Sequence, residues 1–259
     1  MPDTGLAVLT GCPVARISGT LTARKPNNRN PAPRVPKVNV SEAIASRTSC
    51  RAYLPIPVPQ STVRALLDTA RRAPSGGNLQ PWHVYALSGA PLAELLERVR
   101  RKLREQPTGE GSEYDIYPAN LWEPYRSRRY KCGEDMYATI HVAREDKFAR
   151  LRQFARNYEF FGAPVGMFFY IDRRMGPPQW SDVGMYMQSV MLLAREHGLD
   201  TCPQEAWSVW YRTVSDFLGT APELLLFSGM ALGYRDEGAP INRLLTDRAS
   251  LEECATLRF

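Results

Sequence analysis

Apolar residues recur with a helical period along much of the chain. In the segment 59–73 they are spaced i, i+3, i+4 and i+7, the pattern of a helix with one buried face, and Pro59 suits its first turn. Asn39 stands three residues before Glu42, a spacing typical of a capping box, so folded structure is expected to begin near 39 with a short helix. Further helices are predicted over 90–106, 144–161, 180–198 and 208–219.

Short continuous apolar runs predict buried strands at 82–87, 163–172 and 223–234. The stretch 107–135 has no such pattern and is expected to be irregular, although it is rich in aromatic residues. Because a loop of that length is uncommon unless it covers something, the part 114–130 is a candidate lid that shapes specificity. Filling of the core and of an interface is the other interpretation of its aromatic side chains: Tyr114, Tyr117, Trp122, Tyr125 and Tyr130.

The helix expected over 180–198 is apolar around nearly its whole circumference. Such a helix must be buried on all sides. In a chain of 259 residues this indicates a central helix that is shared with a second subunit.

Helices and strands alternate irregularly and no internal repeat occurs, which indicates an α+β or α/β fold with a mixed sheet. The length suits one large domain. We divide the chain into a flexible, basic, Pro-rich arm at 1–38 and a folded domain at 39–259.

Charge and cysteine usage exclude several classes of protein. The net charge is +6, but the first 40 residues hold six basic residues and one acid, so the remainder is almost neutral and nucleic-acid binding is not expected. No apolar run is long enough to span a membrane. The motif VLTGC, ending at Cys12, looks like a lipoprotein cleavage box but lacks a basic flank, so lipidation is not expected. The five scattered cysteines have no metal-ligand spacing, which indicates reduced thiols in a cytoplasmic protein without a metal site.

Three polar segments contain more chemistry than their local structure requires. Within the stretch SRTSCR at 46–51, residues 47–51 offer two guanidiniums and two hydroxyls, a donor set that suits a phosphate group, although a solvated helix end would look the same. The corner PSGGNLQPWH at 74–83 combines glycines that permit close backbone approach with short polar side chains; a well-satisfied turn is the alternative. The stretch DTCPQEAW at 200–207 is expected to be a Pro-fixed loop that presents backbone N–H groups, or simply a connection between helices.

Taken together, these segments resemble the nitroreductase family of flavoproteins. In that family an opening helix ends in Arg-x-Ser-x-Arg/Lys, here 47–51. A later helix ends in Ala-Pro-Ser-x-x-Asn-x-Gln-Pro-Trp, here 73–82, and a buried helix ending in Gly-Leu leads to a Pro-x-Glu loop, here 203–205. The resemblance covers about 40–259, and the stretches 188–207 and 229–242 look nearest to the branch that acts on nitrobenzoates.

The resemblance implies an α+β, three-layer fold with a mixed, mainly antiparallel sheet flanked by helices. It also implies an intertwined homodimer with two noncovalently bound FMN molecules at the interface. Arg47, Ser49 and Arg248 would hold the phosphate, and Thr48 and Arg51 would lie near the ribityl chain and the pyrimidine edge. Asn78 is a candidate for the flavin of the other subunit, and the backbone of Glu205 and Ala206 would face flavin N5. The cofactor-binding set is completed by Pro74, Ser75, Gln80, Gln204 and Gly233.

The function expected from this resemblance is hydride transfer from NAD(P)H, through FMN, to a small nitroaromatic substrate by a ping-pong mechanism. No GxGxxG motif occurs, so NAD(P)H is expected to bind only by stacking in the shared pocket. No catalytic side chain is assigned with certainty. Two alternatives stay open: another reductase of the same flavin fold, acting on enoates or quinones, and a flavin-binding redox sensor that uses Cys50 or Cys202 without turnover.

Overall fold

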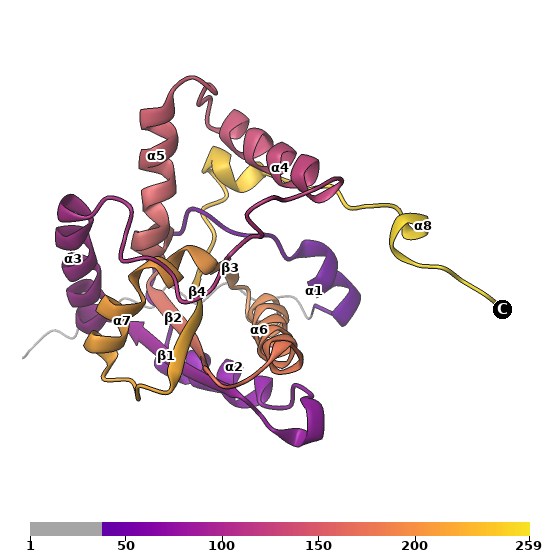
Figure 1. The fold of residues 1–259 in the computed structure, drawn as a ribbon, viewed down its shortest axis with the longest axis horizontal. Coiled ribbons are helices and arrows are strands. Elements are labelled where there is room, and N and C mark those ends of the chain that lie inside the picture. The colour runs from indigo at the N-terminus through magenta and orange to yellow at the C-terminus, as the bar shows by residue number, and fades with distance from the viewer. Residues whose placement is uncertain (1–37) are drawn as a thin grey trace, which may run out of the picture. The chain divides into compact units, whose positions relative to one another are not determined.

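A computed structural model describes residues 38–259, whose main elements are labelled in Figure 1. The predicted arm up to 37 and the Cys12 motif lie outside the described residues, so the division at 38/39 stays a prediction. The helices are α1 (Val40–Ser46), α2 (Gln60–Ala70), α3 (Gly89–Glu105), α4 (Tyr125–Thr139), α5 (Lys147–Ala155), α6 (Pro177–Glu196), α7 (Tyr211–Leu218) and α8 (Leu251–Cys254). Short 3₁₀ turns are η1 (Gly76–Asn78), η2 (Arg156–Gly162), η3 (Glu205–Trp210) and η4 (Pro240–Arg243). The strands are β1 (Trp82–Ser88), β2 (Val165–Asp172), β3 (Asp200–Gln204) and β4 (Leu224–Gly233).

The four strands form one sheet in the order β1-β2-β4-β3, and every ladder is antiparallel. A parallel contact enters only through a single bridge between Ser49 and Thr201, which lies on the β3 side. Among the described residues, β1 therefore has an open edge, while β3 is flanked by the segment after α1.

Helices cover both faces of the sheet. This is necessary because successive side chains of β2 point to opposite faces and nearly all of them are buried. Phe168 and Tyr170 point into a core formed with α3, α7, η2 and η3, and Met167 and Phe169 point into a second core formed with α2 and α6. In Figure 1, α3 and α7 accordingly lie on one side of the strands, and α2 and α6 lie on the other. The predicted three-layer arrangement is confirmed.

The start of the folded region follows from the sequence. The Asn39 side chain accepts a hydrogen bond from the Glu42 N–H at 3.0 Å, and the Glu42 carboxylate accepts from the Asn39 N–H at 2.9 Å. This capping box satisfies two N–H groups that have no partner within the helix, so α1 begins at the predicted place.

Two helix predictions need correction. The stretch 107–135 is not irregular throughout, because α4 begins at Tyr125; α4 has no buried residue, so it lacks the apolar stripe that reveals a helix in sequence. The helix expected over 144–161 ends at Ala155, where the chain passes into η2. Phe160 has a positive φ of 47° there, and its ring fills the space in front of Gly166, where a Cβ would lie 2.3 Å from the ring.

One further prediction fails in part. The stretch that begins at Asp200 is a strand up to Gln204 rather than a loop, because its backbone pairs with β4. Pro203 can occupy this strand because β3 lies near the edge of the sheet, where a missing N–H donor is tolerated. Helix α6 is central, and within one chain Met185 is 38% exposed, so the predicted burial of this helix by a second subunit stays a prediction.

The described residues include no helix that is both long enough and apolar enough to cross a bilayer.

Candidate flavin-binding site

The segment 47–51 lies beside strand β3. Ser49 forms the parallel bridge with Thr201, and the Cys50 N–H donates to the Thr201 carbonyl at 3.0 Å. Polar residues that follow α1 are thereby placed at the edge of the sheet where β3 begins.

Three arginines in this region have no acidic partner among the described residues. Arg47 and Arg51 lie near the sulfur of Cys202, and Arg248 comes from the tail to lie near Arg47. Burial lowers the pKa of Arg47, and the positive charge of Arg248 lowers it further. Within residues 38–259, none of the three has a carboxylate within ion-pair distance; Arg51 donates to the Ser49 carbonyl at 3.2 Å, and Arg248 donates to oxygens of its neighbours Thr246 and Asp247.

This set of groups suits a doubly negative phosphate. A guanidinium can donate two parallel hydrogen bonds to two phosphate oxygens. Guanidiniums that lie close together without acidic partners repel one another, and a bound anion relieves that repulsion. The hydroxyl oxygen of Thr201 is buried and has no hydrogen-bond partner among the described residues, so a polar group at this edge still lacks its partner. The residues present therefore fit the phosphate end of FMN.

Two thiols adjoin the arginines but are not activated. Burial raises the pKa of Cys50 to about 12, and burial also raises the pKa of Cys202 despite the nearby charge of Arg51. Thiolates form with difficulty in such surroundings, so neither cysteine has the character of a redox sensor.

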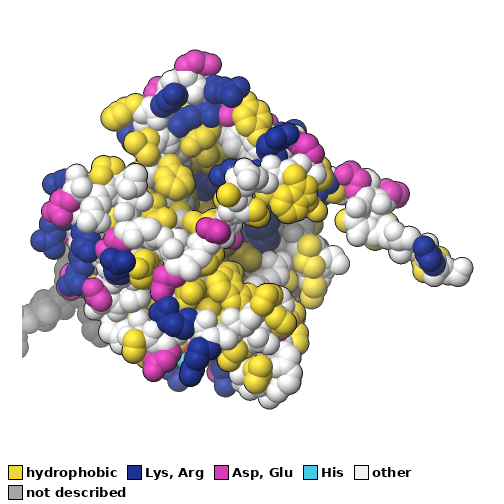
Figure 2. Space-filling model, in the orientation of Figure 1, with side chains coloured by type: hydrophobic (Ala, Val, Ile, Leu, Met, Phe, Trp, Pro, Cys, Tyr) yellow, Lys and Arg dark blue, Asp and Glu magenta, His cyan; other side chains and the backbone are white. Residues whose placement is uncertain are grey.

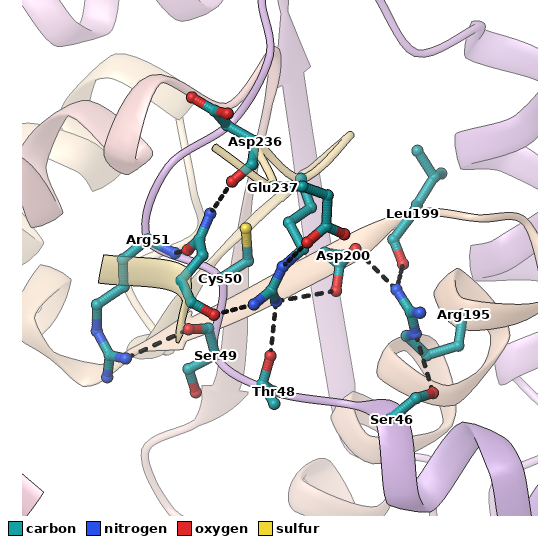
Figure 3. Close-up of polar contacts among 12 residues, drawn as sticks. Ser46, Thr48, Ser49, Cys50, Arg51, Arg195, Leu199, Asp200, Asp236 and Glu237 are labelled. Carbon is teal, nitrogen blue, oxygen red and sulfur yellow. Dashed lines mark hydrogen bonds and ion pairs between the residues drawn. The ribbon is translucent and has the colours of Figure 1, made fainter. Parts of the chain in front are cut away.

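A second pair of arginines shares one buried carboxylate. Asp200, at the start of β3, lies 2.7 Å from Arg195 and 3.9 Å from Arg235. Burial raises the pKa of Asp200, and the two guanidiniums oppose that effect. Arg235, which follows β4, also donates to the Thr48 hydroxyl at 2.8 Å and so ties Thr48 to that part of the chain (Figure 3).

Asn242, in η4, ties the segment to the part of the chain after β4. Its side-chain oxygen accepts from the Arg51 N–H at 2.7 Å, and its amide donates to the Ala52 carbonyl at 2.8 Å. The Ala52 carbonyl accepts a further bond from the Asp236 N–H at 3.1 Å. The backbone around Arg51 is therefore fixed on both sides.

The predicted corner forms a tight turn on the other side of the sheet. The Gln80 N–H donates to the Ser75 hydroxyl at 3.0 Å, and the Gly76 N–H donates to Asp182 of α6 at 3.2 Å. Gly77 and Asn78 have positive φ values of 56° and 57°, which explains a glycine and an asparagine at these positions. Pro74, Asn78 and Gln80 are exposed.

The corner and the arginines are far apart within one chain. The corner contacts α6 at Asp182, whereas Arg195, beside the segment 47–51, lies near the other end of that helix. At 1.5 Å per residue, these two positions are about 20 Å apart. One chain therefore does not bring the two predicted segments to the same group.

The turn η3, which begins at Glu205, packs against one core of the sheet, and the corner at 74–83 packs against the core on the other face. Gln204 ends β3 and donates to the Asn157 carbonyl at 2.8 Å, while its side-chain oxygen has no described partner. Glu205 and Ala206 open η3, whose two tryptophans are buried against α7 and η2. Partial burial raises the pKa of Glu205, although the residue keeps substantial contact with solvent.

Gly233, the remaining predicted contact, closes β4 and is buried. A Cβ there would lie 2.6 Å from Pro164 and 3.0 Å from Tyr53, so the described chain requires a glycine for packing. Nothing at this position faces an open space.

The aromatic stretch consists of two different parts. Its first part is docked on η3 and β4: Ser112 bonds to Ser208 at 3.0 Å, and the Tyr114 hydroxyl donates to the Phe227 carbonyl. The second part is exposed and includes Tyr117, Trp122, Tyr125 and Tyr130. On the face in Figure 2 the surface is hollowed, with basic side chains set back in the hollow and apolar ones at its edge.

A separate hollow of about 720 Å³ lies between α2 and the open edge of β1. Trp82, Val84 and Tyr186 supply apolar walls, and Arg64 and Asp68 lie along its side. It is on the face of the sheet that carries the corner, away from η3.

Sequence reasoning did not assign a role to Arg195, Asp200, Arg235 or Asn242. Arg235 and Asn242 lie in the stretch GYRDEGAPIN, and Asp200 opens the stretch DTCPQEAW. Both stretches belong to the parts of the sequence that resemble nitroreductases. Their contacts join residues far apart in the chain, and nothing in the local pattern predicts those contacts.

Comparison with known proteins identifies the family of this chain. The family model described as "Nitroreductase family" matches residues 44–234. A 4-nitrobenzoate reductase of Pseudomonas putida is 36% identical over 205 residues, which cover 79% of this chain and 89% of that protein. The chain therefore belongs to the nitroreductase family, as predicted.

Solved structures give the same result. The FMN and NADPH-dependent nitroreductase NfnB from Sphigopyxis sp. strain HMH aligns with a TM-score of 0.83 and 44% identity over 86% of this chain and all of that chain. The FMN-dependent nitroreductase NfnB from Mycobacterium smegmatis, in complex with NADPH, aligns with a TM-score of 0.80 and 29% identity over 85% of this chain and 97% of that chain. The predicted nitroreductase-like α+β fold is confirmed.

Proposed function

We propose that this chain is an FMN-dependent oxidoreductase that uses NAD(P)H to reduce small nitroaromatic compounds, including nitrobenzoate-like ones. The observation that carries the proposal is the group of three unpaired guanidiniums, Arg47, Arg51 and Arg248, beside β3. The relatives named for 4-nitrobenzoate reduction and for FMN and NADPH dependence support the substrate class and both cofactors.

When bound, FMN supplies a two-electron carrier between NAD(P)H and the nitro group. Arg47, Ser49 and Arg248 would hold its phosphate, and Thr48 and Arg51 would lie along the ribityl chain and pyrimidine edge. The backbone of Glu205 and Ala206 would face the N5 side. NAD(P)H and the nitroaromatic occupy one pocket in turn, which is a ping-pong sequence.

We also propose that the functional unit is a homodimer in which the corner of one copy completes the site of the other. The corner and Glu205 pack with opposite cores of one chain, so a site that uses both requires two chains. Exposed apolar side chains near α1, the corner and α6 support such contact: Val40, Ile44, Leu79 and Met185. The exposed aromatic residues of 117–130 are proposed as part of the substrate lid.

The alternatives differ from this proposal in measurable ways. A redox sensor needs a reactive thiol, and burial of Cys50 and Cys202 opposes that role. Enoate or quinone reduction by the same fold is distinguished by substrate: nitrobenzoate should be turned over faster than an enoate or a quinone at equal concentration.

The test begins with the absorbance spectrum of the purified protein, which should show bound flavin. Steady-state assays with NADH or NADPH and 4-nitrobenzoate should then give parallel double-reciprocal lines. A colourless protein that refuses FMN contradicts the proposal, and so does flavin that NAD(P)H bleaches but no nitroaromatic reoxidises.

A further inference from the structure

The guanidiniums around the segment 47–51 fall into two groups. One group has no carboxylate partner in the described chain, as shown above. The other consists of Arg195 and Arg235, which share the buried carboxylate of Asp200 at 2.7 and 3.9 Å. Asp200, together with Glu237 beside Arg235, thus balances the charges of these two arginines and leaves the other group positive.

Arg235 uses its whole guanidinium for contacts within the protein. It donates to the Thr48 hydroxyl at 2.8 Å, to the Asn242 carbonyl and to Glu237 at 3.1 Å, and it faces Asp200 (Figure 3). Its side chain is only 16% exposed. Each of its three nitrogens donates to a protein oxygen, which makes this guanidinium a poor ligand for an incoming phosphate but a strong anchor.

The anchor extends through Asn242 to the other end of the segment. The backbone carbonyl of Asn242 accepts a hydrogen bond from the Arg235 guanidinium. The Asn242 side chain accepts from the Arg51 N–H and donates to the Ala52 carbonyl. Thr48 and Arg51, on either side of Ser49, are therefore tied to one buried cluster.

We propose that Arg235, held by Asp200 and Asn242, is a positioning residue that fixes the segment 47–51 in the conformation that receives the flavin phosphate. This inference rests on the proposed function. A preorganised segment does not have to be ordered when the ligand binds, so more of the phosphate contact energy appears as affinity.

The proposal and a purely electrostatic account predict opposite effects for Asp200→Asn. Removing this negative charge makes the surroundings of the arginines more positive, so long-range attraction alone would tighten binding of a dianion. If Asp200 instead holds Arg235 in place, the substitution loosens the segment and weakens binding. The direction of the change therefore distinguishes the two accounts.

The experiment measures dissociation constants of FMN and riboflavin for flavin-free dimeric protein by quenching of flavin fluorescence. Arg235→Gln and Asp200→Asn should each lower the preference for FMN over riboflavin about tenfold, which corresponds to about 1.4 kcal/mol. Arg235→Lys keeps the charge but loses the forked donors, and it should lower the preference less than Arg235→Gln does. Glu105→Gln is the matched control, because it also removes one negative charge but lies exposed in α3, outside the Arg235 cluster, and it should leave the preference unchanged.

Three results overturn the inference: tighter FMN binding by Asp200→Asn, equal weakening of both flavins by Arg235→Gln, or an unchanged preference. If Arg235→Gln does not fold, Arg235→Lys decides, and an unchanged preference in that variant overturns the inference. Failure of the unsubstituted protein to bind FMN would instead refute the proposed function. If Arg47→Ala loses FMN while Arg235→Gln keeps the preference, only the positioning role is refuted.

Discussion

Arg47 and Arg248, from near the start and the end of the folded chain, lie close enough together for their charges to interact. The pKa of Arg47 is lowered by burial and then by the charge of Arg248, although the group stays protonated at neutral pH. Two like charges without an acid between them are destabilising until an anion binds. Removing either one should therefore affect the free and the liganded protein differently.

Arg248→Ala should weaken FMN binding about tenfold or more, because one charge-assisted contact to the phosphate is lost. The flavin-free protein should be no less stable, since the substitution relieves repulsion. Flavin titration and thermal unfolding of the flavin-free protein measure the two effects. Arg101→Ala on the exposed face of α3 is the control; FMN affinity within twofold of the parent for Arg248→Ala would contradict the phosphate assignment.

The separation of Arg47 from Asn78 predicts complementation between chains. Homodimers of Arg47→Ala and of Asn78→Ala should both bind FMN poorly. In a mixed dimer of the two variants, one site should have both residues intact, and the other should lack both. Mixed dimers isolated with two affinity tags should therefore hold one tightly bound flavin per dimer. If both residues serve the same chain's flavin, the mixed dimer has two impaired sites and binds none tightly.

Met185 provides a test of the dimer that leaves the core intact. It is 38% exposed in one chain, whereas Met187 is only 6% exposed, so Met187→Asp would disrupt the fold itself. Met185→Asp should give a folded monomer without flavin, because a desolvated carboxylate opposes contact between two copies. Sedimentation velocity and the flavin-to-protein absorbance ratio measure the outcome, with Arg101→Asp as the control. A monomer of Met185→Asp that keeps FMN would refute the shared site.

The sequence predicted those parts of the fold that depend on local patterns. The helical spacing in 59–73, the Asn39–Glu42 cap and the apolar run of β2 each record a buried face or an unsatisfied N–H group, so each was found. The sequence does not predict helix α4 because this helix has no buried face. It does not predict β3 because a five-residue segment that contains a proline lacks the apolar pattern of a strand.

The site was predicted only as far as a resemblance could bring distant segments together. Arg47 and Arg51 lie near Cys202, and Arg248 lies near Arg47, so a shared role of the three in phosphate binding stays a prediction. The anchoring by Arg235 and Asn242 depends on hydrogen bonds between residues that are far apart in the chain, and no spacing rule in a single sequence reports them. The corner was recognised as a motif, but its distance from the arginines follows from packing against α6.

Burial predicts a definite order of thiol reactivity in the folded protein. The pKa of Cys50 is about 12, mainly because of burial, so at pH 8 only about one molecule in 10,000 carries its thiolate. Cys254 is exposed and should be alkylated quickly, whereas Cys50 and Cys202 should stay unmodified from pH 7 to 10 until the protein unfolds. Peptide mapping after iodoacetamide treatment measures this order. Native Cys50 that reacts as fast as Cys254 would revive the redox-sensor alternative.

Tyr158 should destabilise the folded chain at alkaline pH. Burial raises its pKa to about 12 from an ordinary value near 10, so the unfolded state loses this proton first as pH rises. The free energy of unfolding should therefore fall between about pH 10 and 12, with a contribution of at most about 1.4 kcal/mol per pH unit from this residue. Its hydroxyl has no described hydrogen bond, so Tyr158→Phe should change stability little at pH 7 and make the alkaline decline shallower. Urea unfolding of the flavin-free protein at pH 7, 10 and 11 measures the slope. A parallel decline in both proteins would show that Tyr158 titrates alike in the folded and unfolded states.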